Sequence, residues 1–190
     1  MAETLARKHL PGDLAVWFFI LAELSVFAAL IIAFGVTQIL RSDMFHSSRE
    51  ALNTSTSLYL TISLLSAGGF AALAVATVRR GQQRAAAFLL LSALASAAVY
   101  VLIKLAEYKH LAGLGLDLSY NTFFTLYWLV TGFHFLHVLL GMLILGFMAL
   151  RCWRLEYQAE NLSGLEAGVI YWHMVDLVWV ILFPVIYVLH

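Results

Sequence analysis

The chain has 190 residues, of which 63% are hydrophobic and 12% are charged, whereas soluble domains carry about 45–50% apolar and about 25% charged residues. A water-soluble fold of this length could not bury so much apolar surface, and 11 basic against 11 acidic residues leave no charge excess for binding nucleic acid. We therefore predict an integral membrane protein, organised as one domain over residues 1–190 and in contact with bilayer lipid.

Five apolar stretches are long enough to cross a bilayer, because a hydrocarbon core of roughly 30 Å requires about 20 residues of helix. The first stretch follows a short polar N-terminus. It is much longer than the apolar core of a signal peptide, about 7–15 residues, so we predict an uncleaved membrane span. The sequence thus predicts an all-α bundle of five transmembrane helices. The spans cover approximately residues 14–40, 56–78, 85–105, 122–150 and 165–189.

The second and third spans are rich in small residues and are joined by a short basic turn at residues 79–84. Small residues let helix backbones approach closely in lipid, so we predict that these two spans pack as an antiparallel pair. In the last span, Pro184 removes one backbone hydrogen bond and should kink the helix. Tyr187, near the end of that span, suits the aromatic belt at a membrane interface.

The basic residues predict an orientation, since cytoplasmic loops carry an excess of Lys and Arg. More of them fall on the side of the N-terminus than on the opposite side. We therefore expect the N-terminus inside and the C-terminus outside. The inner side would hold Arg7, Lys8, Arg79, Arg80, Arg84, Arg151 and Arg154, and the outer side Arg41, Arg49, Lys104 and Lys109.

Glu23 is an ionisable residue inside the first span, at a depth of roughly 14 Å from the inner face. An ionisable group at the bilayer centre costs about 2.5–3.5 kcal/mol on insertion scales. Two interpretations stay open. Glu23 is either a protonated, hydrogen-bonded carboxyl group, or a group that belongs to a proton path or binds a lipid headgroup or a partner.

Lys104 and Glu107 lie near the outer end of the third span. They are three residues apart, so they share one face of the helix. We expect a surface ion pair, which would contribute about 0–1 kcal/mol to stability.

The last two spans carry ionisable residues at helical spacing. His134 and His137 are three residues apart, as are His173 and Asp176, and Glu166 precedes His173 by seven. We favour a polar seam that joins these two helices, with interhelical hydrogen bonds worth about 0.6–2 kcal/mol each. A metal site built from facing helices and a bis-histidine haem site stay open as alternatives.

No phosphate loop, nucleophile elbow or paired-cysteine motif occurs in the sequence. Two segments nevertheless resemble signatures of subunit III of the haem-copper (cytochrome c) oxidases. They are residues 131–138 (TGFHFLHV) with Gly141, and residues 171–179 (YWHMVDLVW) preceded by Glu166. Weaker matches, in the family's order, are residues 19–23 (FILAE), 52–55 (LNTS) and 106–108 (AEY). Five matches in order are far more specific than any one of them.

Within that family the chain resembles the five-helix members. The mitochondrial-type subunit has seven helices, and this chain resembles it from the third helix onward. Five-helix forms include the quinol-oxidase type and the subunit III-like protein associated with bacterial nitric oxide reductase. Residues 11–19 (PGDLAVWFF) and 182–187 (LFPVIY) look most like the nitric-oxide-reductase branch.

The resemblance implies a non-catalytic subunit or accessory protein in a bacterial inner (cytoplasmic) membrane. Such a subunit carries no haem, copper or other metal. It packs against a catalytic, haem-containing membrane subunit and stabilises it. It also binds phospholipid and aids proton uptake. It would thereby support terminal oxidase activity in the respiratory chain, or nitric oxide reductase activity in denitrification. Glu23 matches the family's intramembrane glutamate. His134, His137, Glu166, His173 and Asp176 match polar residues that tie the last helices together. The residues alone leave two alternatives, a membrane metalloenzyme and a proton conductor.

Overall fold

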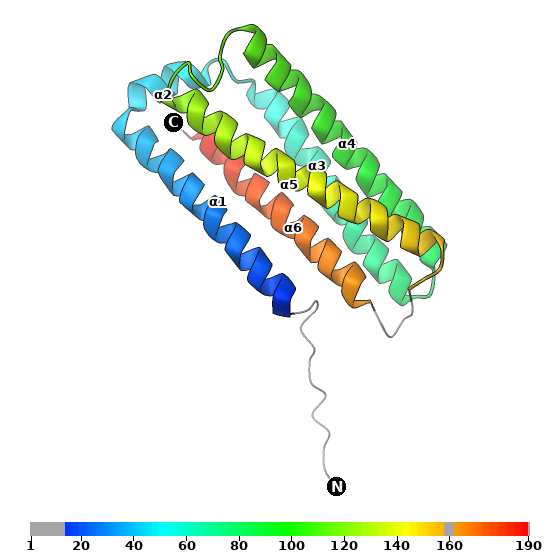
Figure 1. Cartoon of the computed structure of the whole chain (residues 1–190). Helices are drawn as coiled ribbons and strands as arrows, with labels where there is room; N and C mark the ends of the chain where they lie inside the picture. The colour runs from blue at the N-terminus through cyan, green and yellow to red at the C-terminus, as the bar shows by residue number, and fades with distance from the viewer. Residues whose placement is uncertain (1–13, 158–161, 190) are drawn as a thin grey trace.

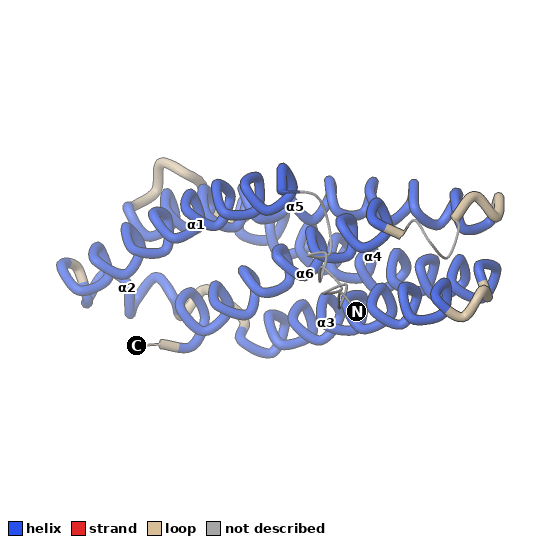
Figure 2. Tube along the Cα trace, turned by 90° about the horizontal axis from the view of Figure 1, so that it is seen from below, coloured by secondary structure: helices blue, strands red, loops and turns tan. Residues whose placement is uncertain are grey.

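The computed structural model of the chain describes residues 14–157 and 162–189. Arg7, Lys8 and the first three residues of the 11–19 motif lie outside the described residues. The described part consists of helices joined by short loops and contains no strand (Figures 1 and 2). The elements are α1 (Leu14–Leu40), α2 (Ser42–Arg49), α3 (Thr54–Arg79), α4 (Gln83–Gly113), α5 (Thr122–Trp153), α6 (Ser163–Phe183) and the π-helical turn η1 (Pro184–Val188).

Five of these helices are long and apolar enough to cross a membrane, which confirms the predicted fold class. The predicted span boundaries differ most in α4, which continues to Gly113 instead of ending near residue 105. Falling hydropathy marks the end of the lipid-facing stretch and not the end of the helix. The short helix α2 was not predicted, because its eight residues are mostly polar and contain no long apolar run.

Local sequence sets where several helices begin and turn. Asn53 caps α3, since its Oδ1 accepts hydrogen bonds from the amides of Ser55 at 2.9 Å and Thr56 at 3.2 Å. Asn121 caps α5 in the same way. Gly81 has φ of 76° in the turn between α3 and α4, a conformation that glycine adopts without steric cost. The two caps set where α3 and α5 begin, and the Gly81 turn reverses the chain between α3 and α4.

α3 and α4 pack together more extensively than any other pair of helices, which confirms the predicted antiparallel pair. Small side chains line both sides of this contact. Fully buried alanines on α3 face fully buried alanines on α4, so the two backbones come close. These are Ala67, Ala71 and Ala74 on α3 and Ala86, Ala93 and Ala97 on α4.

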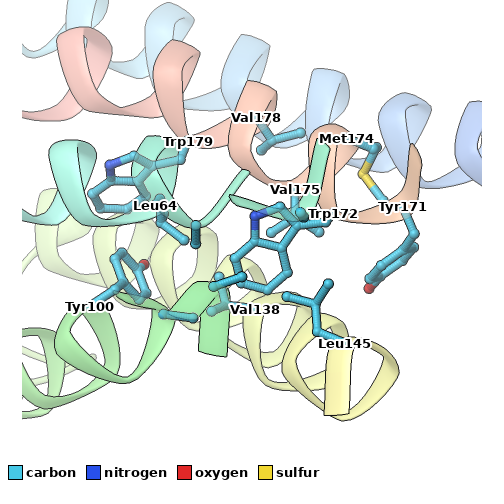
Figure 3. Packing of buried hydrophobic residues seen from close by; sticks show 14 of the residues in the cluster. Leu64, Tyr100, Val138, Leu145, Tyr171, Trp172, Met174, Val175, Val178 and Trp179 are labelled. Atoms are coloured by element: carbon cyan, nitrogen blue, oxygen red, sulfur yellow. The ribbon is translucent and has the colours of Figure 1, made fainter. Parts of the chain in front are cut away.

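α6 lies at the centre of the bundle, in contact with α1, α3 and α5 (Figure 1). Its two tryptophans, Trp172 and Trp179, are fully buried and form much of the core (Figure 3). Gly141 of α5 makes room for one of them. A Cβ added at Gly141 would lie 2.8 Å from a ring carbon of Trp172.

α1 packs at the edge of the bundle, against α5 and α6. Only three of its residues are buried, Ile20, Phe27 and Phe34, and they are spaced seven residues apart. A seven-residue spacing keeps one narrow stripe of a helix against its neighbours. Most of the α1 surface is therefore free to face lipid or another chain.

Pro184 ends α6 at Phe183, and the chain continues as η1. The buried Arg49 of α2 donates hydrogen bonds to the carbonyl oxygens of Ile186 at 2.8 Å and Val185 at 3.1 Å. Burial lowers the pKa of the Arg49 guanidinium, but arginine stays charged at any pH of interest. Arg49 thus holds the C-terminal turn against α2.

We predict that Gly141→Ala lowers the thermal stability of the chain in detergent. The added methyl group would push against the buried Trp172 ring, a cost of about 1–3 kcal/mol. Gly132→Ala is the matched control, because nothing lies within 4 Å of a Cβ at Gly132. Circular dichroism during heating measures both variants, and equal melting temperatures for the two would contradict this packing.

Candidate functional site

The most polar part of the interior is a cluster formed by Lys104 and Glu107 of α4, Tyr127 of α5 and Tyr187 of η1, here called the Lys104 cluster. Lys104 Nζ lies 2.9 Å from Glu107 Oε2, 3.0 Å from the Tyr127 hydroxyl and 2.8 Å from the Tyr187 hydroxyl. The Tyr187 hydroxyl donates to Glu107 Oε1 at 2.9 Å. An ammonium group has three protons to donate, and here each proton has an oxygen acceptor.

The Lys104 cluster differs from the surface ion pair expected from the sequence. The Lys104 side chain is 0% exposed and the Glu107 side chain 9%. Lys104 Nζ also lies 4.8 Å from the ring centroid of Tyr108 and 4.9 Å from that of Tyr127, within the range of cation–π attraction. A buried ion pair survives only when its remaining hydrogen-bonding capacity is met, as it is here.

Sequence reasoning found the spacing of Lys104 and Glu107 but missed their tyrosine partners. Tyr187 was expected in an interfacial belt, yet it is 3% exposed and points into the bundle. Lys104 and Glu107 lie inside α4, which continues for two more turns beyond them, and this position was the signal that was missed. A lysine in such a position needs partners from other helices.

Two pockets adjoin the Lys104 cluster. Glu107 lines one of about 350 Å³, together with Asn53, Thr56 and His110. Tyr187 lines the other, of about 290 Å³, together with Arg49. Both lie beside the segment between α2 and α3, so the buried cluster approaches the protein surface on both sides of that segment.

Glu23 of α1 pairs with His137 of α5. His137 Nε2 lies 3.0 Å from Glu23 Oε2, and His137 Nδ1 lies 2.8 Å from the carbonyl oxygen of Phe133. A carbonyl oxygen only accepts, so Nδ1 carries a proton. The pair is then either imidazole with a carboxylic acid or imidazolium with a carboxylate, and both states are net neutral. This pair ties the edge helix α1 to the bundle.

His173 and Asp176 pair within α6. His173 Nδ1 lies 3.1 Å from Asp176 Oδ2. The carboxylate rests on the backbone of α3 at Gly68, where an added Cβ would overlap it. The His173 side chain is 45% exposed and the Asp176 side chain 11%. Glycine at position 68 is what lets this polar pair sit between α3 and α6.

The structure does not bring the predicted residues of α5 and α6 together in a single seam. His137 turns to α1, and Glu166 instead bonds Arg79 of α3, with Oε1 2.7 Å from the guanidinium. His134 is fully buried, stacks on Trp179 at 5.1 Å, and has no hydrogen-bond partner among the described residues. These hydrogen-bond partners differ from those of the expected seam, because helical spacing gives the face of a residue but not which neighbour it meets.

The Lys104 cluster, the Glu23–His137 pair and the His173–Asp176 pair are therefore separate from one another. Within residues 14–157 and 162–189, no group of three or more His, Cys, Asp and Glu side chains is arranged to hold a metal ion. His137 and His173 are each hydrogen-bonded to a carboxylate instead. The Lys104 cluster and the Glu23–His137 pair suit joining helices.

Comparisons with known proteins agree with this picture. The family described as cytochrome c oxidase subunit III matches residues 9–190. A cytochrome c oxidase subunit 3 from Schizophyllum commune is 35% identical over 133 residues, which are 70% of this chain and 48% of that protein. A second one, from Thermostichus vulcanus, is 41% identical over 87 residues, which are 43% of this chain and 41% of that protein.

The match to another relative covers more of both chains. A probable quinol oxidase subunit 3 from Staphylococcus aureus is 24% identical over 178 residues, which are 94% of this chain and 89% of that protein. The chain spans about half the length of the cytochrome c oxidase relatives above.

We predict that Lys104→Met lowers the free energy of unfolding by about 3–5 kcal/mol, the usual cost of removing one partner from a buried ion pair. Glu107 would be left buried without its cation. The matched control is Lys109→Met, since Lys109 is an exposed lysine of the same helix. Thermal unfolding in detergent compares the variants. If Lys104→Met melts at the same temperature as Lys109→Met, the cluster does not stabilise the bundle.

Proposed function

The chain belongs to the cytochrome c oxidase subunit III family, and from that premise we propose that it is a non-catalytic subunit of a respiratory haem-copper oxidase. It would pack against a catalytic, haem-containing membrane subunit and stabilise it. The haem, and copper where present, would belong to that partner. The observation that carries this proposal is the family match over nearly the whole chain.

The polar geometry supports a structural role over a redox role. Glu23, His137, His173 and Asp176 each have a hydrogen-bonded partner within the chain, and Lys104 has three. Among the described residues these side chains form pairs, and no three His, Cys, Asp or Glu side chains gather as metal ligands would. A subunit built in this way can alter the stability, lipid contacts or proton access of a partner without taking part in its chemistry.

We propose that the protein lies in a bacterial inner membrane, with its N-terminus inside and its C-terminus outside. Phospholipid would cover the exposed apolar faces of the helices. Glu23 is the candidate for a lipid-linked or proton-linked role, because its side chain is 21% exposed at the edge of the bundle beside His137. An exchangeable proton shared by these two groups would suit a role in proton uptake by the partner.

Two kinds of partner complex are candidates. The Staphylococcus aureus relative covers 94% of the chain, which favours an oxidase of the quinol-oxidase type. The resemblance of residues 11–19 and 182–187 to the nitric-oxide-reductase branch favours an accessory role in denitrification instead. The two differ in the terminal acceptor, which is oxygen in one and nitric oxide in the other.

The test measures oxygen and nitric oxide consumption in whole cells of the source organism, with and without the gene for this chain. Haem content of the membranes is held equal between strains. We expect the oxygen rate to fall selectively if the partner is an oxidase, and the nitric oxide rate to fall selectively if it is the reductase. Unchanged rates for both gases would refute the proposed function, although the five-helix fold would stand.

A further inference from the structure

His173 is a polar side chain on the outside of a membrane helix. It lies ten residues into α6, which is roughly 15 Å along the helix axis. Its neighbours on the same face, Leu177, Val180 and Ile181, are 52%, 42% and 44% exposed. The imidazole is thus surrounded by apolar surface near the middle of a span, although ionisable groups in membranes usually face the bundle interior.

The outward nitrogen of this imidazole is a hydrogen-bond donor. Nδ1 is engaged by Asp176 Oδ2, and Nε2 has no hydrogen-bond partner among the described residues. Mid-membrane depth favours net-neutral states of the pair. In both such states, imidazolium with carboxylate and imidazole with carboxylic acid, Nε2 carries a proton. A partner that places an acceptor oxygen at this face would therefore hydrogen-bond to this nitrogen.

The surface beside His173 allows another helix to come close. Gly68 lies under the His173–Asp176 pair, and the next residue, Gly69, is exposed with nothing within 4 Å of an added Cβ. Ala72, one turn further along α3, is also exposed. Small residues permit close backbone contact between membrane helices. We call His173 and Leu177 of α6, with Gly69 and Ala72 of α3, the His173 face.

We propose that the His173 face is the docking surface for a transmembrane helix of the haem-bearing subunit, and that this helix brings an acceptor oxygen to His173 Nε2. This inference rests on the proposed function and adds to it the face and the chemistry of the contact. A second copy of the chain fits less well. It would set donor against donor, and the acceptor it could offer, Asp176, is 89% covered, since its side chain is 11% exposed.

The proposal is tested by photocrosslinking in native membranes. A benzoylphenylalanine replaces Leu177 on the His173 face or, as the control, Leu143 on α5, which is 71% exposed. We expect a crosslink to the haem-bearing subunit from position 177 and none from position 143. A crosslink from 143 alone, a crosslink between two copies from 177, or no crosslink from either position while the subunits co-purify would overturn the proposal. Absence of co-purification would instead overturn the proposed function.

Three substitutions distinguish an effect on docking from an effect on folding. Gly69→Leu should release the chain from the haem-bearing subunit on a native gel while leaving its own melting temperature unchanged, because its side chain projects into open space. Gly132→Leu, with equal room around it on α5, should leave the association intact. His173→Phe should weaken association about three- to thirtyfold, the loss of one interhelical hydrogen bond. Equal association for Gly69→Leu and Gly132→Leu would contradict the assigned face.

Discussion

Lipid does not solvate charge, so an ionisable side chain inside the five spans has to be neutralised or hydrogen-bonded by the protein itself. Lys104 shows the consequence most clearly. Its ammonium group is wholly buried and takes one acceptor from its own helix, one from α5 and one from η1. Forming this cluster therefore requires α4, α5 and the C-terminal turn to be in register, and the same constraint explains the pairing of Glu23 with His137.

Three of the polar contacts each join a different pair of helices. Glu23 and His137 connect α1 to α5, Arg79 and Glu166 connect α3 to α6, and Arg49 connects α2 to η1. The outcome is a bundle whose polar groups are mostly used in holding it together. His173 differs from these groups, because its side chain is 45% exposed near the middle of α6.

The sequence predicted the spans well because hydropathy over 20 residues is a local property. It predicted the α3–α4 pair for the same reason, since a short turn forces neighbours to pack. It could not predict that His137 would meet Glu23 and not Asp176, because partner choice depends on how the helices are arranged around α6. It also placed Lys104 and Tyr187 at the surface. Lys104 lies near the end of an apolar run, which was taken as the end of the helix, whereas α4 continues to Gly113.

Glu23 with His137 and His173 with Asp176 form hydrogen-bonded pairs, and neither pair is a redox centre. Metal analysis and a visible spectrum of the tagged chain, purified first with its native partners and then separated from them in detergent, test this claim most directly. We expect a haem spectrum that stays with the larger partner, and no stoichiometric iron, copper or zinc on the separated chain. One metal ion or haem per chain that is lost on His137→Ala or His173→Ala would contradict it.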